Sequence, residues 1–240
     1  MSRPIRRPHA PVAELPRTEP SSPLSNRFRQ RIEANGYPCV GAKGALSRDQ
    51  MTFYEGRSIA SAWDDVALSR DLAIFAREYV RLRPLFCTFV AAFPDSPPLD
   101  EAAFEKAVWT RIASLQAKDE WLGYDYDENV DEDPASPQFS LSFGGQAFFV
   151  VGMHPAASRP ARRFDCPVMV FNLHDQFERL REDGRYEKMR ATILERDREV
   201  AGSINPMLTR FGEQSEARQY SGRAVGPDWK CPWPGRENKQ

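Results

Sequence analysis

The chain has 240 residues, 41% of them hydrophobic, and a formal net charge of −1 at pH 7. This length suits one globular domain with its own core, and no apolar run approaches the length of a membrane-spanning helix. A net charge so close to zero excludes bulk electrostatic attraction to nucleic acid or to an anionic membrane, so we expect neither as a partner.

The first 23 residues are rich in proline and arginine and lack the apolar stretch of a secretory signal. We therefore expect a disordered tail over 1–23, followed by one domain over 24–240. The chain has four cysteines that are far apart and show no CxxC pairing: Cys39, Cys87, Cys166 and Cys231. Without an export signal, these cysteines are expected to be reduced thiols, which predicts a cytoplasmic protein.

Helical periodicity dominates the first half of the chain. Leu24, Phe28 and Ile32 recur at helical spacing, and longer periodic stretches follow. The elements predicted for this half are, in chain order, a helix at 24–36, a short strand or loop at 37–45, a helix at 64–83, a buried strand at 85–93 and a helix at 100–121.

Strand signals cluster in the second half, after an acidic, proline-punctuated loop. The glycine pair Gly144-Gly145 predicts a turn between two strands. The predicted elements are a loop at 125–137, two strands within 139–153, a strand at 167–174, helices at 175–184 and 185–202, and an irregular segment at 203–234. This order favours an α+β fold class: a single domain whose mainly antiparallel sheet is flanked by helices, with an irregular C-terminal segment.

The segment VGMHPAASRPARRF, residues 151–164, concentrates cationic side chains directly behind an apolar strand. His154 is expected at the end of that strand, where binding sites are commonly built. Arg159, Arg162 and Arg163 can bind a dianion, because guanidinium groups hold carboxylates and phosphates in bidentate fashion. A nucleotide phosphate, the propionates of a heme or an acidic substrate would fit. The alternative is a capped histidine beside a solvated basic turn.

The segment DWKCPWP, residues 228–234, places one cysteine between two tryptophans and two prolines. Cys231 could ligate heme iron as a thiolate, with the N–H of Trp229 or nearby backbone amides tuning the sulfur. The alternative is a buried structural cysteine in a C-terminal clamp. Cys39 and Cys166 are weaker candidates of the same kind.

The segment FGEQSEARQYSGR, residues 211–223, alternates acids, amides and arginines. Glu213 and Glu216 could bind a cationic group such as a guanidine, because a carboxylate–guanidinium pair gives both affinity and orientation. The alternative is internal pairing of these carboxylates with Arg218 and Arg223.

Taken together, these segments resemble the YqcI/YcgG family. The matching stretches are YPCVGAKGA, FGGQAFFVVGMHPAASRPARRF, VFNLHDQFERLRE, GSINPML, FGEQSEARQYSGR and DWKCPWP. They occur in the expected order and cover about residues 25–234. The resemblance implies a heme-dependent oxygenase that N-hydroxylates a guanidine or amine group, such as that of arginine. The stretch PCVGAKGA is also similar to the pre-guanitoxin N-hydroxylase branch.

This resemblance implies heme b as the cofactor and O2 as the oxidant. The electrons are expected from an external donor, because no flavin or nicotinamide motif is present. It also implies that Arg159, Arg162 and Arg163 neutralise the propionates, with Ser158 as an additional hydrogen-bond donor.

The axial ligand of the iron remains open between Cys231 and His154. A thiolate donates electron density that favours O–O bond cleavage, which favours Cys231. Imidazole is the commoner heme ligand, and His154 lies closest in sequence to the arginines. A histidine that is not on the iron could hydrogen-bond bound O2 and deliver protons. His174 is a second candidate for that role, with a satisfied structural histidine as the alternative.

The expected function is therefore that of a heme-dependent monooxygenase (N-hydroxylase) acting on a small molecule that carries a guanidine or amine. Glu213 and Glu216 would orient the cation, and Asn172 would also contact the substrate. The alternative is a heme sensor or carrier without turnover. A phosphoryl-compound binder that uses the arginine cluster is a third possibility.

Overall fold

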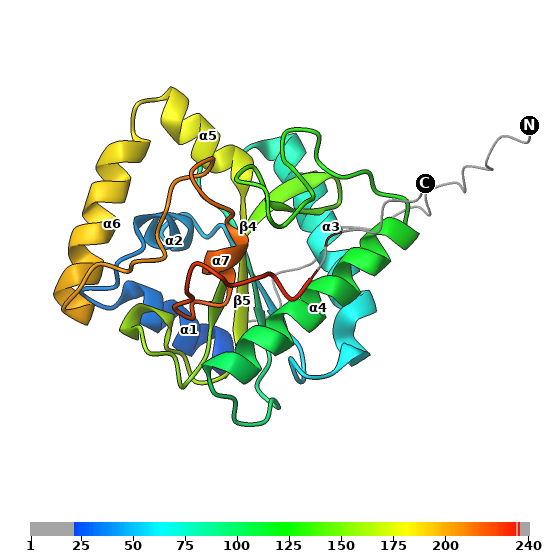
Figure 1. Ribbon diagram of the computed structural model, residues 1–240, viewed down its shortest axis with the longest axis horizontal. Helices are drawn as coiled ribbons and strands as arrows, with labels where there is room; N and C mark the ends of the chain where they lie inside the picture. The colour runs from blue at the N-terminus through cyan, green and yellow to red at the C-terminus, as the bar shows by residue number, and fades with distance from the viewer. Residues whose placement is uncertain (1–21, 234, 236–240) are drawn as a thin grey trace, which may run out of the picture.

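The computed structural model describes residues 22–233 and residue 235, which form one five-stranded sheet with helices on both faces (Figure 1). The strands lie in the order β1 (Met51–Glu55), β2 (Thr88–Ala92), β5 (Val168–Leu173), β4 (Gln146–Met153) and β3 (Leu141–Phe143). β1 pairs with β2 in parallel, and every other pairing is antiparallel. The predicted α+β domain with a mainly antiparallel sheet is confirmed.

The predicted helices form close to their expected limits. They are α1 (Pro23–Glu33), α3 (Asp65–Leu82), α4 (Glu101–Trp121), α5 (His174–Glu182) and α6 (Tyr186–Ala201). The Ser22 hydroxyl caps α1 by accepting a hydrogen bond from the backbone N–H of Ser25, so the helix begins one residue earlier than predicted. The rest of the predicted tail, residues 1–21, lies outside the described residues. None of the described helices is long and apolar enough to cross a membrane.

Two elements differ from the predictions, and packing explains the first of them. Residues expected as a strand or loop form the short helix α2 (Val40–Leu46), which Cys39 caps through its sulfur. A Cβ on Gly44 would lie 3.0 Å from the Phe86 ring, which shows how closely α2 packs at this point. This packing stabilises α2 as a helix although its two glycines give it a low helix propensity. The edge strand β1 was not predicted, and Met51 is the one buried residue among its five.

The sheet separates two apolar layers, because successive side chains of a strand point to opposite faces. On β5, Met169, Phe171 and Leu173 belong to the cluster that packs against α3 and α4. Val168 and Val170 point the other way and join the cluster that contains α1. The face toward α1 is also the face that α5 and α6 cover in Figure 1.

The C-terminal segment is irregular, as predicted, apart from the short helix α7 (Ala217–Tyr220). Two contacts fasten it to the domain. Tyr220 is fully buried in the core. Directly after it, the buried carboxylate of Glu105 on α4 accepts hydrogen bonds from the Ser221 hydroxyl at 3.2 Å and from Arg223 Nε at 3.0 Å. These contacts hold α7 against the end of β4.

Gly152 of β4 makes the close approach of α7 possible. A Cβ at this position would lie 2.8 Å from the backbone oxygen of Tyr220 and 2.9 Å from the Phe104 ring. Real side chains do not reach such distances, and the Tyr220 oxygen belongs to backbone that cannot rotate away. The absence of a side chain at Gly152 is therefore a packing requirement.

We expect G152A to lower the free energy of unfolding by about 1–3 kcal/mol, the usual cost of overpacking. The control is G226A, because a Cβ on Gly226 meets no atom within 4 Å. Chemical denaturation of both variants measures the difference. Equal stability of G152A and G226A would contradict the packing requirement.

Candidate functional site

A cavity of about 260 Å³ lies between the sheet and the layer made by α1, α2, α5 and α6. Its walls are mainly apolar. α1 contributes Phe28 and Ile32, while α6 contributes Met189, Ile193 and Leu194. Such a volume is slightly below the range of roughly 300–1,000 Å³ that is typical of small-molecule pockets. Because its walls are mainly apolar and its volume is close to that range, we take this cavity as the candidate site.

The sheet forms the floor of the cavity through alternate residues of two strands. β4 presents Phe149, Val151 and Met153, and β5 presents Val170 and Asn172. β1 and β2 add Met51 and Thr88. Asn172 therefore offers a hydrogen-bonding group on a mainly apolar surface. The structure thus places Asn172, predicted as a substrate contact, inside the cavity.

His174 and Glu216 meet at the edge of this floor. His174 is the first residue of α5, directly after β5, and Glu216 precedes α7. His174 Nε2 lies 4.0 Å from Glu216 Oε1, and both residues are buried and line the cavity. His174 Nε2 has no hydrogen-bond partner among the described residues. Unsatisfied buried polar atoms in a cavity indicate a place for a ligand or water.

Burial determines the charge state of both residues. It raises the pKa of Glu216 to about 8, although hydrogen bonds from Ser140 and Tyr220 oppose the shift. Burial also lowers the pKa of His174, while Glu178 acts in the opposite direction. At neutral pH, Glu216 is therefore largely protonated and His174 neutral. A cation in the cavity would favour the ionised form of Glu216.

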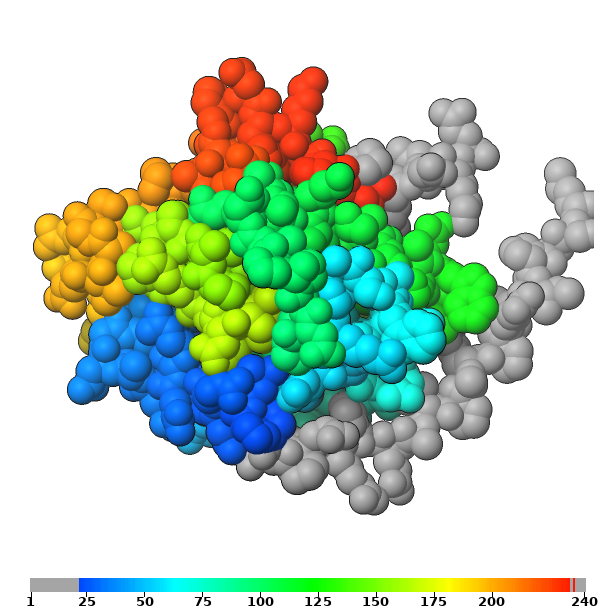
Figure 2. All heavy atoms as spheres, turned by 90° about the horizontal axis from the view of Figure 1, so that it is seen from below, coloured from blue at the N-terminus to red at the C-terminus, as the bar shows by residue number. Residues whose placement is uncertain are grey.

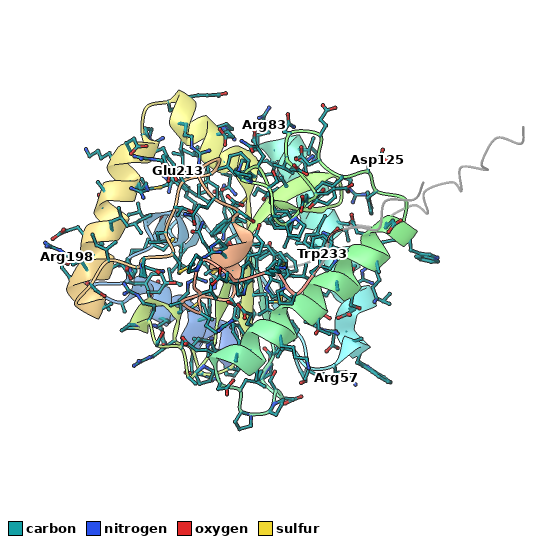
Figure 3. All side chains as sticks on the ribbon, in the orientation of Figure 1. Arg57, Arg83, Asp125, Arg198, Glu213 and Trp233 are labelled. Carbon is teal, nitrogen blue, oxygen red and sulfur yellow. The ribbon has the colours of Figure 1, made fainter. Side chains whose placement is uncertain are left out.

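Glu213, the other predicted carboxylate, lies outside the cavity. It is exposed, accepts a hydrogen bond from the backbone N–H of Arg210 at 3.0 Å and pairs with the Arg210 guanidinium. The labels in Figure 3 place Glu213 near α5 and α6. The predicted alternative for this segment was that Glu213 and Glu216 pair with Arg218 and Arg223. Neither carboxylate forms such a pair, and Arg223 pairs with Glu105 instead.

Two of the three predicted arginines line the cavity, and they differ in their partners. Arg162 is buried, and its guanidinium donates to the backbone oxygens of Gly152 at 3.0 Å, Gln219 at 3.1 Å and Tyr220 at 3.3 Å. These acceptors are neutral, and no described carboxylate forms an ion pair with Arg162. Arg159 has a carboxylate partner, because it contacts Asp197 of α6. Arg162 therefore keeps a positive charge available to an anionic ligand group.

Ser158 and Arg163, also predicted to hold propionates, do not line the cavity. Ser158 donates through its backbone N–H and its hydroxyl to Glu101 of α4, at 2.9 and 2.7 Å. Arg163 turns back to the backbone oxygens of Ala157 and Ser158. Figure 2 shows the turn around 155–165 (yellow-green) at the surface between α1 (blue) and α4 (green). These two side chains stabilise the turn itself.

The two predicted axial ligands, Cys231 and His154, also lie away from the cavity lining. Cys231 and Trp229 pack against the core cluster on the α3–α4 side of the sheet. Figure 3 shows Trp233, two residues further on, beside α4. The His154 ring stacks on Phe104 of α4, with ring centroids 4.2 Å apart. Neither residue therefore lies among the residues that line the cavity with Glu216 and His174.

Cys39 is the cysteine that does line the cavity. Its sulfur accepts a hydrogen bond from the backbone N–H of Ala42 at 3.3 Å, at the start of α2. Burial raises the pKa of the Cys39 thiol, while the Ala42 and Gly41 amides and the nearby Arg162 guanidinium oppose the shift. From the sequence, Cys39 was only a weaker candidate, because the residues around it in YPCVG do not show which way the cysteine side chain points.

Comparison with known proteins identifies the family of the chain. A sequence profile of the YqcI/YcgG family matches residues 28–234, which include every residue that lines the cavity. A protein of Bacillus subtilis (strain 168) named "Uncharacterized protein YqcI" is 24% identical over 208 residues, covering 81% of this chain and 80% of that protein. No solved structure matches the chain. The chain belongs to the YqcI/YcgG family.

Proposed function

We propose that the protein is a heme-dependent monooxygenase that N-hydroxylates a small molecule bearing a guanidine or amine. The observation that carries this proposal is one cavity that combines a half-buried thiol, an arginine without a carboxylate contact and a buried carboxyl. Cys39, Arg162 and Glu216 supply these three groups. They suit, in that order, an iron ligand, a heme propionate and a cationic substrate.

The donor set supports a metal that is carried in a macrocycle. Among the described residues, no group of three or more His, Cys, Asp or Glu could hold a metal ion by itself. One soft thiol beside apolar walls suits a single axial bond to an iron already held by four ring nitrogens. Binding of the metal would displace the thiol proton of Cys39, and the Ala42 amide would then donate to the thiolate.

Arg162 and Arg159 would bind the two propionates. Arg162 is already fixed by three backbone oxygens, so it presents its charge at little further cost in conformational entropy. Arg159 would share its guanidinium between Asp197 and a propionate.

The outer wall of the cavity, α6, has Asp197 as its one buried residue among those described. A ligand larger than the cavity would need a wall such as α6 to move outward.

When bound, heme supplies the reduction of O2 and the transfer of one oxygen atom, with electrons from an external donor. The protein's own groups bind and orient the substrate. Glu216 would pair with the cationic nitrogen group, and Asn172 would hydrogen-bond it from the floor of the cavity. His174 would hold a proton at Nε2, facing the same space.

We expect C39S to lose the thiolate type of ferrous–CO Soret band, while C231S retains it. Serine is a good helix N-cap, so C39S should preserve α2 and the fold. The measurement is an optical spectrum of each purified protein after expression with a heme precursor. A protein that binds no heme, or a loss confined to C231S, would contradict the proposed site.

We expect agmatine and L-arginine, used as guanidine probes, to shift the iron spin state of the heme-loaded protein. E216Q should weaken this effect by about 10- to 100-fold in probe concentration, because a charge-assisted contact is lost. E213Q is the matched control and should behave like the wild type. A spectrum that stays unchanged with both probes would argue for the alternative, a heme sensor or carrier.

We expect the folded protein to lose stability relative to E216Q as the pH rises from about 4.5 to about 8. The raised pKa means that the folded state holds a proton which the unfolded state releases, so higher pH favours unfolding. The loss should be on the order of a few kcal/mol. Urea denaturation at both ends of this range measures it, and parallel curves for the wild type and E216Q would contradict the buried, protonated carboxyl.

A further inference from the structure

Glu178, His174 and Glu216 lie in a row from the protein surface to the interior of the cavity. His174 Nδ1 is 3.7 Å from Glu178 Oε1, and its Nε2 is 4.0 Å from Glu216 Oε1. The Glu178 side chain is 42% exposed, whereas that of Glu216 is 8% exposed. The imidazole thus separates a carboxylate in contact with solvent from a carboxyl that is not.

We propose that these three residues form a proton-transfer chain between solvent and the cavity. The inference rests on the proposed function, because oxygen reduction consumes protons and binding of a cation at Glu216 releases one. Imidazole suits the middle position, since it can accept a proton at one nitrogen while it donates from the other. Both separations exceed a direct hydrogen bond, and a small side-chain rotation or one water closes each of them.

The transfer balances at each step. When a cation binds, the Glu216 carboxyl gives its proton to His174 Nε2, and the O–H bond breaks as the N–H bond forms. The proton on His174 Nδ1 then passes to the Glu178 carboxylate and on to water. The ring is left neutral with its proton on Nε2. The reverse sequence returns a proton to the cavity and restores the first tautomer.

The surroundings of His174 direct protons along this row. Burial lowers the pKa of His174 most strongly, so the ring rests neutral, and Arg181 acts in the same direction. Glu178 and Asp175 on α5 and Asp127 in the acidic loop favour the protonated ring that transfer requires. The side chain of Phe211 covers the ring from the C-terminal segment, with ring centroids 4.3 Å apart. The uncovered nitrogens therefore face Glu178 and Glu216.

The test follows proton arrival at Glu216 in purified full-length protein, without heme or substrate, starting from a pH above the Glu216 pKa of about 8 so that the carboxyl is ionised before the protons are released. Protons are released from a photolabile compound, and the carboxylic acid band of Glu216 is followed by time-resolved infrared spectroscopy. E216Q identifies that band. We expect E178Q and H174Q to slow its appearance by about tenfold or more, the size of effect that positioned proton donors give. E182Q, which removes another exposed acid of α5, should leave the rate unchanged.

Three outcomes would overturn the chain: no band that E216Q removes, unchanged rates in both E178Q and H174Q, or equal slowing in E182Q. If H174Q does not fold, E178Q decides alone, because Glu178 is a partly exposed side chain and glutamine keeps its size. Since neither heme nor substrate is used, failure here leaves the proposed function standing. Failure of heme binding likewise leaves this result unaffected.

Discussion

Arg162 carries a positive charge into the interior of the domain, where burial would be costly without hydrogen bonds. Its guanidinium meets that cost by donating to the backbone oxygens of Gly152, Gln219 and Tyr220. These bonds join β4 to an irregular C-terminal segment that has few backbone bonds of its own. They also fix α7, and with α7 the residue before it, Glu216. Arg162 thus both fixes the position of the buried Glu216 carboxyl and supplies positive charge to the cavity.

The sheet divides the molecule into a structural side and a cavity side. On the structural side, α3 and α4 cover aromatic residues, and the C-terminal stretch that carries Trp229 and Cys231 packs against the same cluster. On the other side, a looser layer covers the same strands and leaves the cavity. The alternation of side chains along β4 and β5 makes this division possible, because each strand serves a core and a binding surface at once.

Much of the fold follows from sequence periodicity, whereas the choice among similar site residues does not. The helices around Phe28, Phe75 and Phe104 and the strands of the hairpin were predictable from apolar spacing. His174, Asn172 and Glu216 were identified as candidates and lie together in the cavity.

The remaining site residues depend on which face of an irregular segment points inward. Glu213 and Glu216 are three residues apart, yet only Glu216 is buried. Ser158 and Arg163 share a turn with Arg162 but point elsewhere. Cys39 caps the helix α2, which tertiary packing stabilises and local propensity does not predict. No periodic signal distinguishes such neighbours.

The most direct measurement is the position of iron in a crystal of the heme-loaded protein, found from its anomalous scattering. We expect iron within bonding distance of Cys39 Sγ, with α6 displaced outward; iron bound to Cys231 or His154 would contradict the proposed site.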